Sequence, residues 1–130
     1  MHLSVKPIHT AKAKIWVDEP GVLCMQPNKG VELNLEDVKE YFRICREYLR
    51  GSGKTVQLMY GLNDFTMSKE AREYIADHAA ELFLASAMIT HNLAIRLIVT
   101  FFDRFHKSEV PFKSFETVED AREWLLTFKN

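Results

Sequence analysis

The chain has 130 residues, of which 47% are hydrophobic and 27% are charged, the usual composition of a single globular domain spanning residues 1–130. Its 17 basic and 18 acidic residues give a formal net charge of -1, and no stretch concentrates lysine and arginine, which argues against nucleic-acid binding. The N-terminus lacks a hydrophobic signal, and the most apolar segment, residues 93–102, is shorter than the ~20 residues of a membrane span. We therefore expect a cytoplasmic protein that is not an integral membrane protein.

The first predicted elements are two antiparallel strands. Residues 14–18 alternate polar and apolar side chains, and residues 22–26 form a short apolar run. Glu19-Pro20-Gly21 between them has the composition of a tight turn, because proline fixes φ at the second position and glycine accepts a positive φ at the third. The chain is therefore predicted to open with a β-hairpin.

An amphipathic helix is predicted to follow the hairpin. Apolar residues recur at three- and four-residue steps from Leu35 to Leu49. Asn34 is a candidate N-cap, and Gly51 follows the last turn, so both helix ends have a signal. Residues 55–60 then predict a strand.

A loop over residues 61–67 leads to a second predicted helix, which begins at Ser68 and extends to Phe83. Its apolar face consists of Ala71, Tyr74, Ile75, Ala79, Leu82 and Phe83. The following segment, residues 84–89, is short and apolar and therefore predicts a buried strand.

Residues 93–105 are ambiguous, since their β-branched residues favour a strand whereas their length and spacing favour a helix, which we predict. Such a helix would be apolar on nearly every side. It is covered either by its own domain or by another molecule, such as a second copy in a homodimer. Residues 111–115 predict a last strand and residues 117–128 a closing helix, in which Trp124 is interpreted as packing.

The predicted order is β-β-α-β-α-β-α-β-α, in which strand-helix-strand units form right-handed parallel crossovers. The fold class is therefore α/β, with a mixed, mostly parallel sheet of about five strands and about four helices. Cys24 and Cys45 form no C-x-x-C motif and occupy apolar positions, so we interpret them as core thiols.

This order, together with four stretches, resembles the STAS domains, the fold shared by anti-sigma-factor antagonists and sulfate-transporter tails. The stretches are residues 68–72 (SKEAR), 92–102 (NLAIRLIVTFF), 111–115 (PFKSF) and 119–125 (EDAREWL). The chain looks most similar to small stand-alone bacterial proteins called SpoIIAA-like. The resemblance implies a SpoIIAA/STAS-like fold and a regulatory role through protein binding.

In the antagonists, a phosphorylatable serine in a D-S-S-G-like turn opens the second helix and docks on a kinase. Ser68 corresponds to it, but the segment from Asp64 to Ser68 lacks the paired serine and the glycine. Ser68, Thr66 and Asp64 are therefore candidates for phosphorylation or partner contact, because a helix dipole favours a phosphate at its N-terminus. The alternative is that Ser68 is an ordinary N-cap. The leading hypothesis is a non-enzymatic signalling module without a cofactor, which binds a protein partner.

Two other functions are considered. A carrier of a small apolar ligand or lipid would use a pocket or interface formed by Phe65, Met67, Phe101, Phe102 and Phe105. An unrecognised hydrolase would use Asp64, Ser68 and His91 as acid, nucleophile and base, but no G-x-S-x-G motif accompanies them.

Two further patterns are weak. Gly51-Ser-Gly-Lys-Thr55 is similar to the end of a phosphate-binding P-loop, but Tyr48 stands where the motif needs glycine. The segment is also predicted to end a helix and begin a strand, the reverse of a P-loop. The five histidines lack ligand spacing such as H-x-x-x-H, so we expect no metal site.

Overall fold

The structure is a computed structural model that describes residues 6–18, 21–105 and 109–129, with the backbone alone at residues 98 and 101–105. The main sheet has the order β1-β2-β3-β5-β7-β8 within these ranges, so it contains six strands rather than the predicted five. Strands β1, β2 and β3 are antiparallel, and β3, β5, β7 and β8 run parallel. The bounds are Ile8–His9 (β1), Ala13–Asp18 (β2), Val22–Pro27 (β3), Thr55–Tyr60 (β5), Phe83–Ile89 (β7) and Phe112–Phe115 (β8). The predicted mixed, mostly parallel sheet is confirmed.

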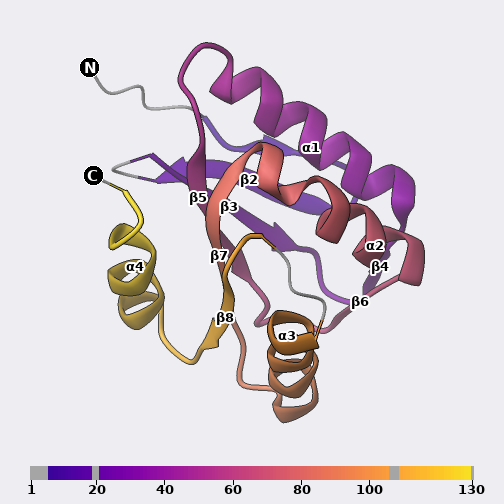
Figure 1. Ribbon diagram of the computed structural model, residues 1–130. Helices are drawn as coiled ribbons and strands as arrows, with labels where there is room; N and C mark the ends of the chain where they lie inside the picture. Colours follow the sequence, from indigo (N-terminus) through magenta and orange to yellow (C-terminus); the bar gives the residue numbers. More distant parts are fainter. Residues whose placement is uncertain (1–5, 19–20, 106–108, 130) are drawn as a thin grey trace.

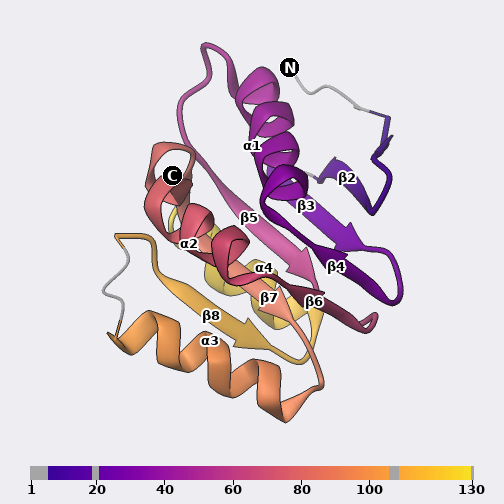
Figure 2. The same ribbon diagram turned by 90° about the vertical axis from the view of Figure 1, so that its right-hand side faces the viewer.

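Helices cover both faces of this sheet. The α-helices are α1 (Leu35–Leu49), α2 (Lys69–His78), α3 (Leu93–Phe105) and α4 (Val118–Leu126), so the four predicted helices are confirmed. Helices α1, α2 and α3 lie on one face of the sheet, and α4 is the one described helix on the other (Figure 1, Figure 2). The domain therefore has three layers with a hydrophobic cluster on each side of the sheet.

The predicted hairpin is formed by β2 and β3. Their register pairs Ala13 with Pro27 and Asp18 with Val22. The Gly21 amide donates to the Asp18 carbonyl oxygen over 2.7 Å, and Gly21 has a φ of +97°, a value that favours glycine. The other two predicted turn residues, at positions 19 and 20, lie outside the described residues.

The loop predicted for residues 61–67 contains a short strand. Phe65–Met67 (β6) pairs in parallel with Val31–Leu33 (β4) and forms a separate two-stranded sheet. The Ser68 amide extends this pairing by donating to the Leu33 carbonyl oxygen over 3.0 Å. Strands of three residues are too short to show an alternating pattern, so the sequence gives no sign of them.

The second helix is shorter than predicted. It ends at His78, a 3-10 turn follows over Ala79–Glu81 (η1), and Phe83 already belongs to β7. Ala79 and Phe83 are both buried, although they lie on different elements. Apolar residues that are buried on a turn and on a strand can continue a helical spacing by coincidence, so periodicity placed the helix end too late.

The two faces of the sheet are packed differently. Below α1 and α2, Phe42 meets Tyr74 and Phe83 edge to face, with ring centroids 5.3 and 6.0 Å apart. On the other face, Ala121 and Leu125 of α4 are fully buried against the sheet. Trp124 is only partly buried, and its ring packs against the rings of Phe115 and Phe128, with centroid distances of 5.6 and 5.0 Å.

Cys24 and Cys45 are free and buried, one on each face, which confirms their interpretation as core thiols. Burial raises the pKa of each thiol to about 12. Both sulfur atoms therefore stay protonated at neutral pH and are poor nucleophiles.

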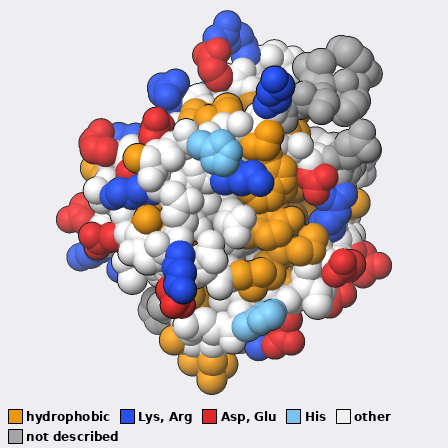
Figure 3. All heavy atoms as spheres, turned by 180° about the vertical axis from the view of Figure 1, so that it is seen from behind, with side chains coloured by type: hydrophobic (Ala, Val, Ile, Leu, Met, Phe, Trp, Pro, Cys, Tyr) orange, Lys and Arg blue, Asp and Glu red, His pale blue; other side chains and the backbone are white. Residues whose placement is uncertain are grey.

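Some apolar side chains stay at the surface. Seen from behind, hydrophobic side chains form a band beside charged ones (Figure 3). Leu93 and Leu97 of α3 are 66% and 61% exposed, so this chain alone does not cover the whole helix. None of the helices within the described ranges has the length and apolar character required to cross a membrane.

Candidate functional site

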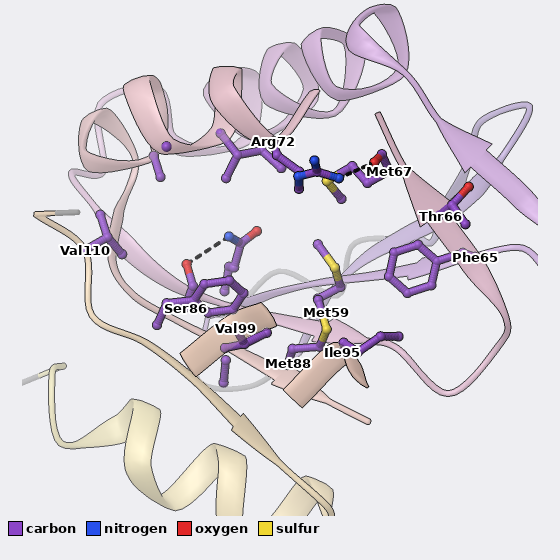
Figure 4. Close-up of a pocket in the computed structure, with 16 residues that line it drawn as sticks. Met59, Phe65, Thr66, Met67, Arg72, Ser86, Met88, Ile95, Val99 and Val110 are labelled. Atoms are coloured by element: carbon purple, nitrogen blue, oxygen red, sulfur yellow. Dashed lines mark hydrogen bonds between the residues drawn. The ribbon is translucent and has the colours of Figure 1, made fainter. Parts of the chain in front are cut away.

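A cavity of about 320 Å³ lies between the parallel part of the sheet and helices α2 and α3 (Figure 4). Strands β5, β7 and β8 form its floor, α2 forms one wall, and α3 and β6 form the others. Its described lining is mostly apolar and includes Met59, Met88, Ile95, Val99, Val110 and Phe112. The cavity therefore offers an apolar space that the described side chains around it do not fill.

The register of β5 and β7 determines the floor. Alternate residues of a strand share one face, so Gln57 and Met59 of β5 lie on the same side. The parallel pairing sets Gln57 beside Ser86 and Met59 beside Met88. The floor consequently has a polar pair next to a pair of thioethers.

The polar pair belongs to a buried chain of hydrogen bonds. The Tyr41 hydroxyl of α1 donates to Gln57 Oε1 over 2.5 Å, and Gln57 Nε2 donates to Ser86 Oγ over 2.9 Å. Burial holds the pKa of Tyr41 well above its ordinary value, so the phenol stays neutral and remains a donor. The Ser86 hydroxyl proton is left for a further acceptor, because its oxygen is the acceptor from Gln57.

Strand β6 and helix α2 form the rim of the cavity. Phe65 and Met67 line it, and the exposed Thr66 between them lies at its edge. Nη1 of the Arg72 guanidinium donates to the Met67 carbonyl oxygen over 2.8 Å, which ties α2 to β6 (Figure 4). Among the described lining residues, Arg72 alone carries a charge.

The sequence candidates in the loop before α2 have structural roles. The Ser68 hydroxyl accepts from the Ala71 amide over 3.1 Å, as its interpretation as an N-cap requires. Asp64 has an exposed side chain, and its carbonyl oxygen accepts from the Gly30 amide over 2.5 Å. Phosphorylation of Ser68 or Thr66 stays a prediction.

The predicted ligand pocket is found in part. Phe65 and Met67 line the cavity as the carrier hypothesis requires. Phe101, Phe102 and Phe105 lie in the last turns of α3, where the side chains are outside the described part of the chain. The described side chains that α3 contributes are Ile95 and Val99, one turn apart.

The three residues of the hydrolase hypothesis do not form a hydrogen-bonded triad within the described part of the chain. Nε2 of His91 lies 3.0 Å from the Glu116 carbonyl oxygen, and Ser68 caps α2. No hydrogen bond between described residues links Asp64, Ser68 and His91. Over the same ranges, no group of three or more histidine, cysteine or acidic residues is placed to hold a metal ion.

The glycine-rich segment between α1 and β5 has the predicted context. Gly51 and Gly53 have φ values of +77° and +80°, and the segment ends a helix and begins a strand. The Thr55 hydroxyl donates to the Gly21 carbonyl oxygen over 2.6 Å. It therefore ties two turns together at this end of the sheet.

Sequence reasoning missed the polar residues of the cavity, namely Gln57, Ser86 and Arg72. A signal for the first two exists, because each stands inside an otherwise apolar strand, and a polar side chain there needs a buried partner. The partner could not be identified, since the strand register is set by tertiary packing. Arg72 gave no signal, because a charge on an amphipathic helix normally faces water.

Two matches relate this domain to known proteins. A family model described as "Domain of unknown function (DUF7793)" matches residues 15–129. The crystal structure of an uncharacterized protein from the DUF3478 family, with a SpoIIAA-like fold, from Shewanella loihica PV-4 is similar, with a TM-score of 0.64 and 20% sequence identity. The match covers 87% of this chain and 91% of that one, and it confirms the predicted SpoIIAA-like fold. No curated protein matches the chain.

Proposed function

Because the chain belongs to the family of the domain of unknown function DUF7793, whose description names no activity, we propose from the cavity that this domain binds a small apolar molecule. The observation that carries the proposal is the apolar space of about 320 Å³ between the sheet, α2 and α3. Ligand pockets of proteins span roughly 300 to 1,000 Å³ and are lined by apolar side chains with a few polar groups. This cavity has both properties.

A packing defect is a poor explanation for a space of this size. Protein interiors are packed as densely as organic crystals, and few of their voids exceed one water molecule. The liquid volume of a water molecule is about 30 Å³, so the cavity is about ten times larger than the space of one water molecule. Methionines at positions 59, 67 and 88 favour ligand binding further, because flexible thioethers adapt to different apolar shapes.

The test is an isothermal calorimetric titration of the purified full chain with octan-1-ol. We expect a Kd below about 1 mM for the native protein. Ala76→Phe places a ring in the cavity, because Ala76 lines it, and should weaken binding at least about tenfold. The matched control is Ala94→Phe on the exposed side of α3, which should bind like the native protein. Absence of binding to the native protein, or equal binding by Ala76→Phe, contradicts the proposal.

A second candidate is a regulatory module that binds a protein partner or a second copy through the loop over residues 61–68 and the start of α3. Leu62 and Leu93 are 49% and 66% exposed, and they follow the carboxyl ends of the neighbouring parallel strands β5 and β7. They therefore lie at the same edge of the sheet. Native mass spectrometry of the protein purified from its own cell separates the candidates, since a bound small molecule favours the first and a bound polypeptide the second.

A further inference from the structure

Resting on the proposed function, we propose that the ligand is a medium-chain carboxylic acid whose carboxylate binds the Arg72 guanidinium and whose chain fills the apolar part of the cavity. A purely apolar ligand would leave the one charged residue of the described lining without a role. Arg72 projects from α2, and its guanidinium lies at the rim next to β6. The cavity therefore combines an apolar interior with a single positive charge.

Among the arginines whose side chains the structure describes, Arg72 alone has no carboxylate oxygen within 4.0 Å. Every other arginine whose side chain the structure describes lies within 4.0 Å of a carboxylate oxygen, in the pairs Arg43–Glu40, Arg46–Glu81, Arg50–Glu47, Arg96–Glu116 and Arg122–Asp18. Within the described ranges, the Arg72 guanidinium is hydrogen-bonded only to the Met67 carbonyl oxygen. Most of its guanidinium donors therefore remain for a ligand.

The position of the guanidinium is fixed before a ligand binds. Its hydrogen bond to the Met67 carbonyl oxygen is 2.8 Å long and holds the side chain along the upper wall of the cavity, facing Met59 and Phe65 (Figure 4). The planar guanidinium presents paired N–H groups that match the two oxygens of a carboxylate. A single arginine also balances one negative charge, whereas a phosphate monoester carries nearly two.

The size of the cavity fits a short acyl chain. A space of about 320 Å³, about ten times the liquid volume of a water molecule, is on the scale of an eight-carbon acid such as octanoate. Beyond the carboxylate, the chain would lie against Met59, Met88, Ile95 and Val99. These side chains offer no hydrogen-bonding group apart from the weakly accepting thioethers, so this part of the ligand must be apolar.

The polar pair on the floor is the competing place for the carboxylate. Gln57 and Ser86 are neutral, and they already bond to each other over 2.9 Å. A hydrogen bond between two charged groups is stronger than one between a neutral donor and an ion. The carboxylate is therefore stabilised more beside Arg72 than beside Ser86.

The experiment compares octanoate with octan-1-ol, which has the same chain length without the charge, by calorimetric titration of the full chain. We expect the native protein to bind octanoate at least about tenfold more tightly than octan-1-ol, because octanoate gains a bidentate ion pair with the guanidinium. Arg72→Gln should remove this preference, so that octanoate and octan-1-ol bind the variant with Kd values within about twofold of each other. Arg72→Lys should retain part of it, because lysine keeps the charge but not the planar fork. Ser86→Ala should leave the preference intact.

The outcomes separate this inference from the proposed function. Equal binding of the two ligands by the native protein overturns the role of Arg72 and leaves the apolar cavity as a ligand site. Loss of the preference in Ser86→Ala but not in Arg72→Gln moves the carboxylate to the floor and also overturns the inference. Binding of neither ligand overturns the proposed function as well. The comparison of the two ligands in the native protein needs no variant, so it can overturn the inference even if Arg72→Gln fails to fold.

Discussion

Gln57 connects three elements that lie far apart in the sequence. Its side-chain oxygen accepts from Tyr41 of α1, its amide nitrogen donates to Ser86 of β7, and its backbone belongs to β5. A buried polar group without a partner costs the full energy of its desolvation, so the three side chains stabilise the fold only as a connected set. The same set forms the polar part of the cavity floor, which links the stability of the domain to the shape of its candidate site.

Replacement of Tyr41 by phenylalanine tests this chain of hydrogen bonds. Tyr41→Phe removes the donor to Gln57 Oε1 and leaves that buried oxygen without a partner, so we expect a loss of about 1–3 kcal/mol in the free energy of unfolding. Urea denaturation monitored by tryptophan fluorescence measures it. The control is Tyr48→Phe on the same helix, a partly buried tyrosine whose hydroxyl bonds to no described residue, and it should change stability by less than about 0.5 kcal/mol. An equal loss of stability in the two variants would argue against a stabilising role for this chain of hydrogen bonds.

Among the elements, those with a chemical signal at their ends were predicted best. Helix α1 begins after Asn34 and ends at Leu49 as predicted, because the cap at one end and glycine at the other are local signals. Helix α2 has a cap at Ser68 but no glycine at its end, and its C-terminus was placed too late. Strands β4 and β6 were missed, because three-residue strands exist only through their pairing with each other.

The N-terminus of α1 is held by more than its cap. Asn34 accepts from the Glu36 and Asp37 amides, and Asp37 in turn accepts from the Asn34 amide and from Lys12 Nζ, each over 2.8 Å. Desolvation alone would raise the pKa of Asp37, but these two hydrogen bonds lower it below its ordinary value of 3.8. The Asp37 carboxylate therefore stabilises the folded state fully at pH values above its ordinary pKa of 3.8. This stabilisation is lost as the pH falls through the lowered pKa of the folded state.

Removal of the cap should destabilise the domain by a predictable amount. Asn34→Ala removes the side-chain acceptor of two helix amides, and we expect a loss of about 1 kcal/mol in the free energy of unfolding at neutral pH. Asn34→Asp keeps an acceptor at the same position and should lose only a few tenths of that amount. Thermal and urea denaturation of the two variants measure the difference. An Asn34→Asp variant as unstable as Asn34→Ala would show that the side-chain amide, rather than the cap, matters.

At the scale of the whole molecule, the order of elements predicted the α/β class, and the resemblance to STAS domains, which also rests on four sequence stretches, predicted the SpoIIAA-like fold. Neither predicted the cavity. The cavity depends on the register of β5 against β7 and on how far α2 and α3 stand from the sheet. Those distances result from packing among residues far apart in sequence, and no local pattern encodes them. The carrier hypothesis named Phe65 and Met67 as apolar residues that could line a pocket. The apolar cavity residues inside strands, such as Met59 and Met88, are indistinguishable from core residues in the sequence.

The exposed leucines of α3 permit a last test of how this molecule is assembled. Leu93 and Leu97 are one turn apart and 66% and 61% exposed, so within a single chain they bury little area. The double change Leu93→Ser and Leu97→Ser should therefore alter the free energy of unfolding of a monomer by no more than about 1 kcal/mol, measured by urea denaturation at low protein concentration. A larger loss would show that α3 packs through these side chains. Sedimentation of the same samples at high concentration decides whether a second copy covers α3, since a native dimer that the double variant abolishes places the interface on this helix.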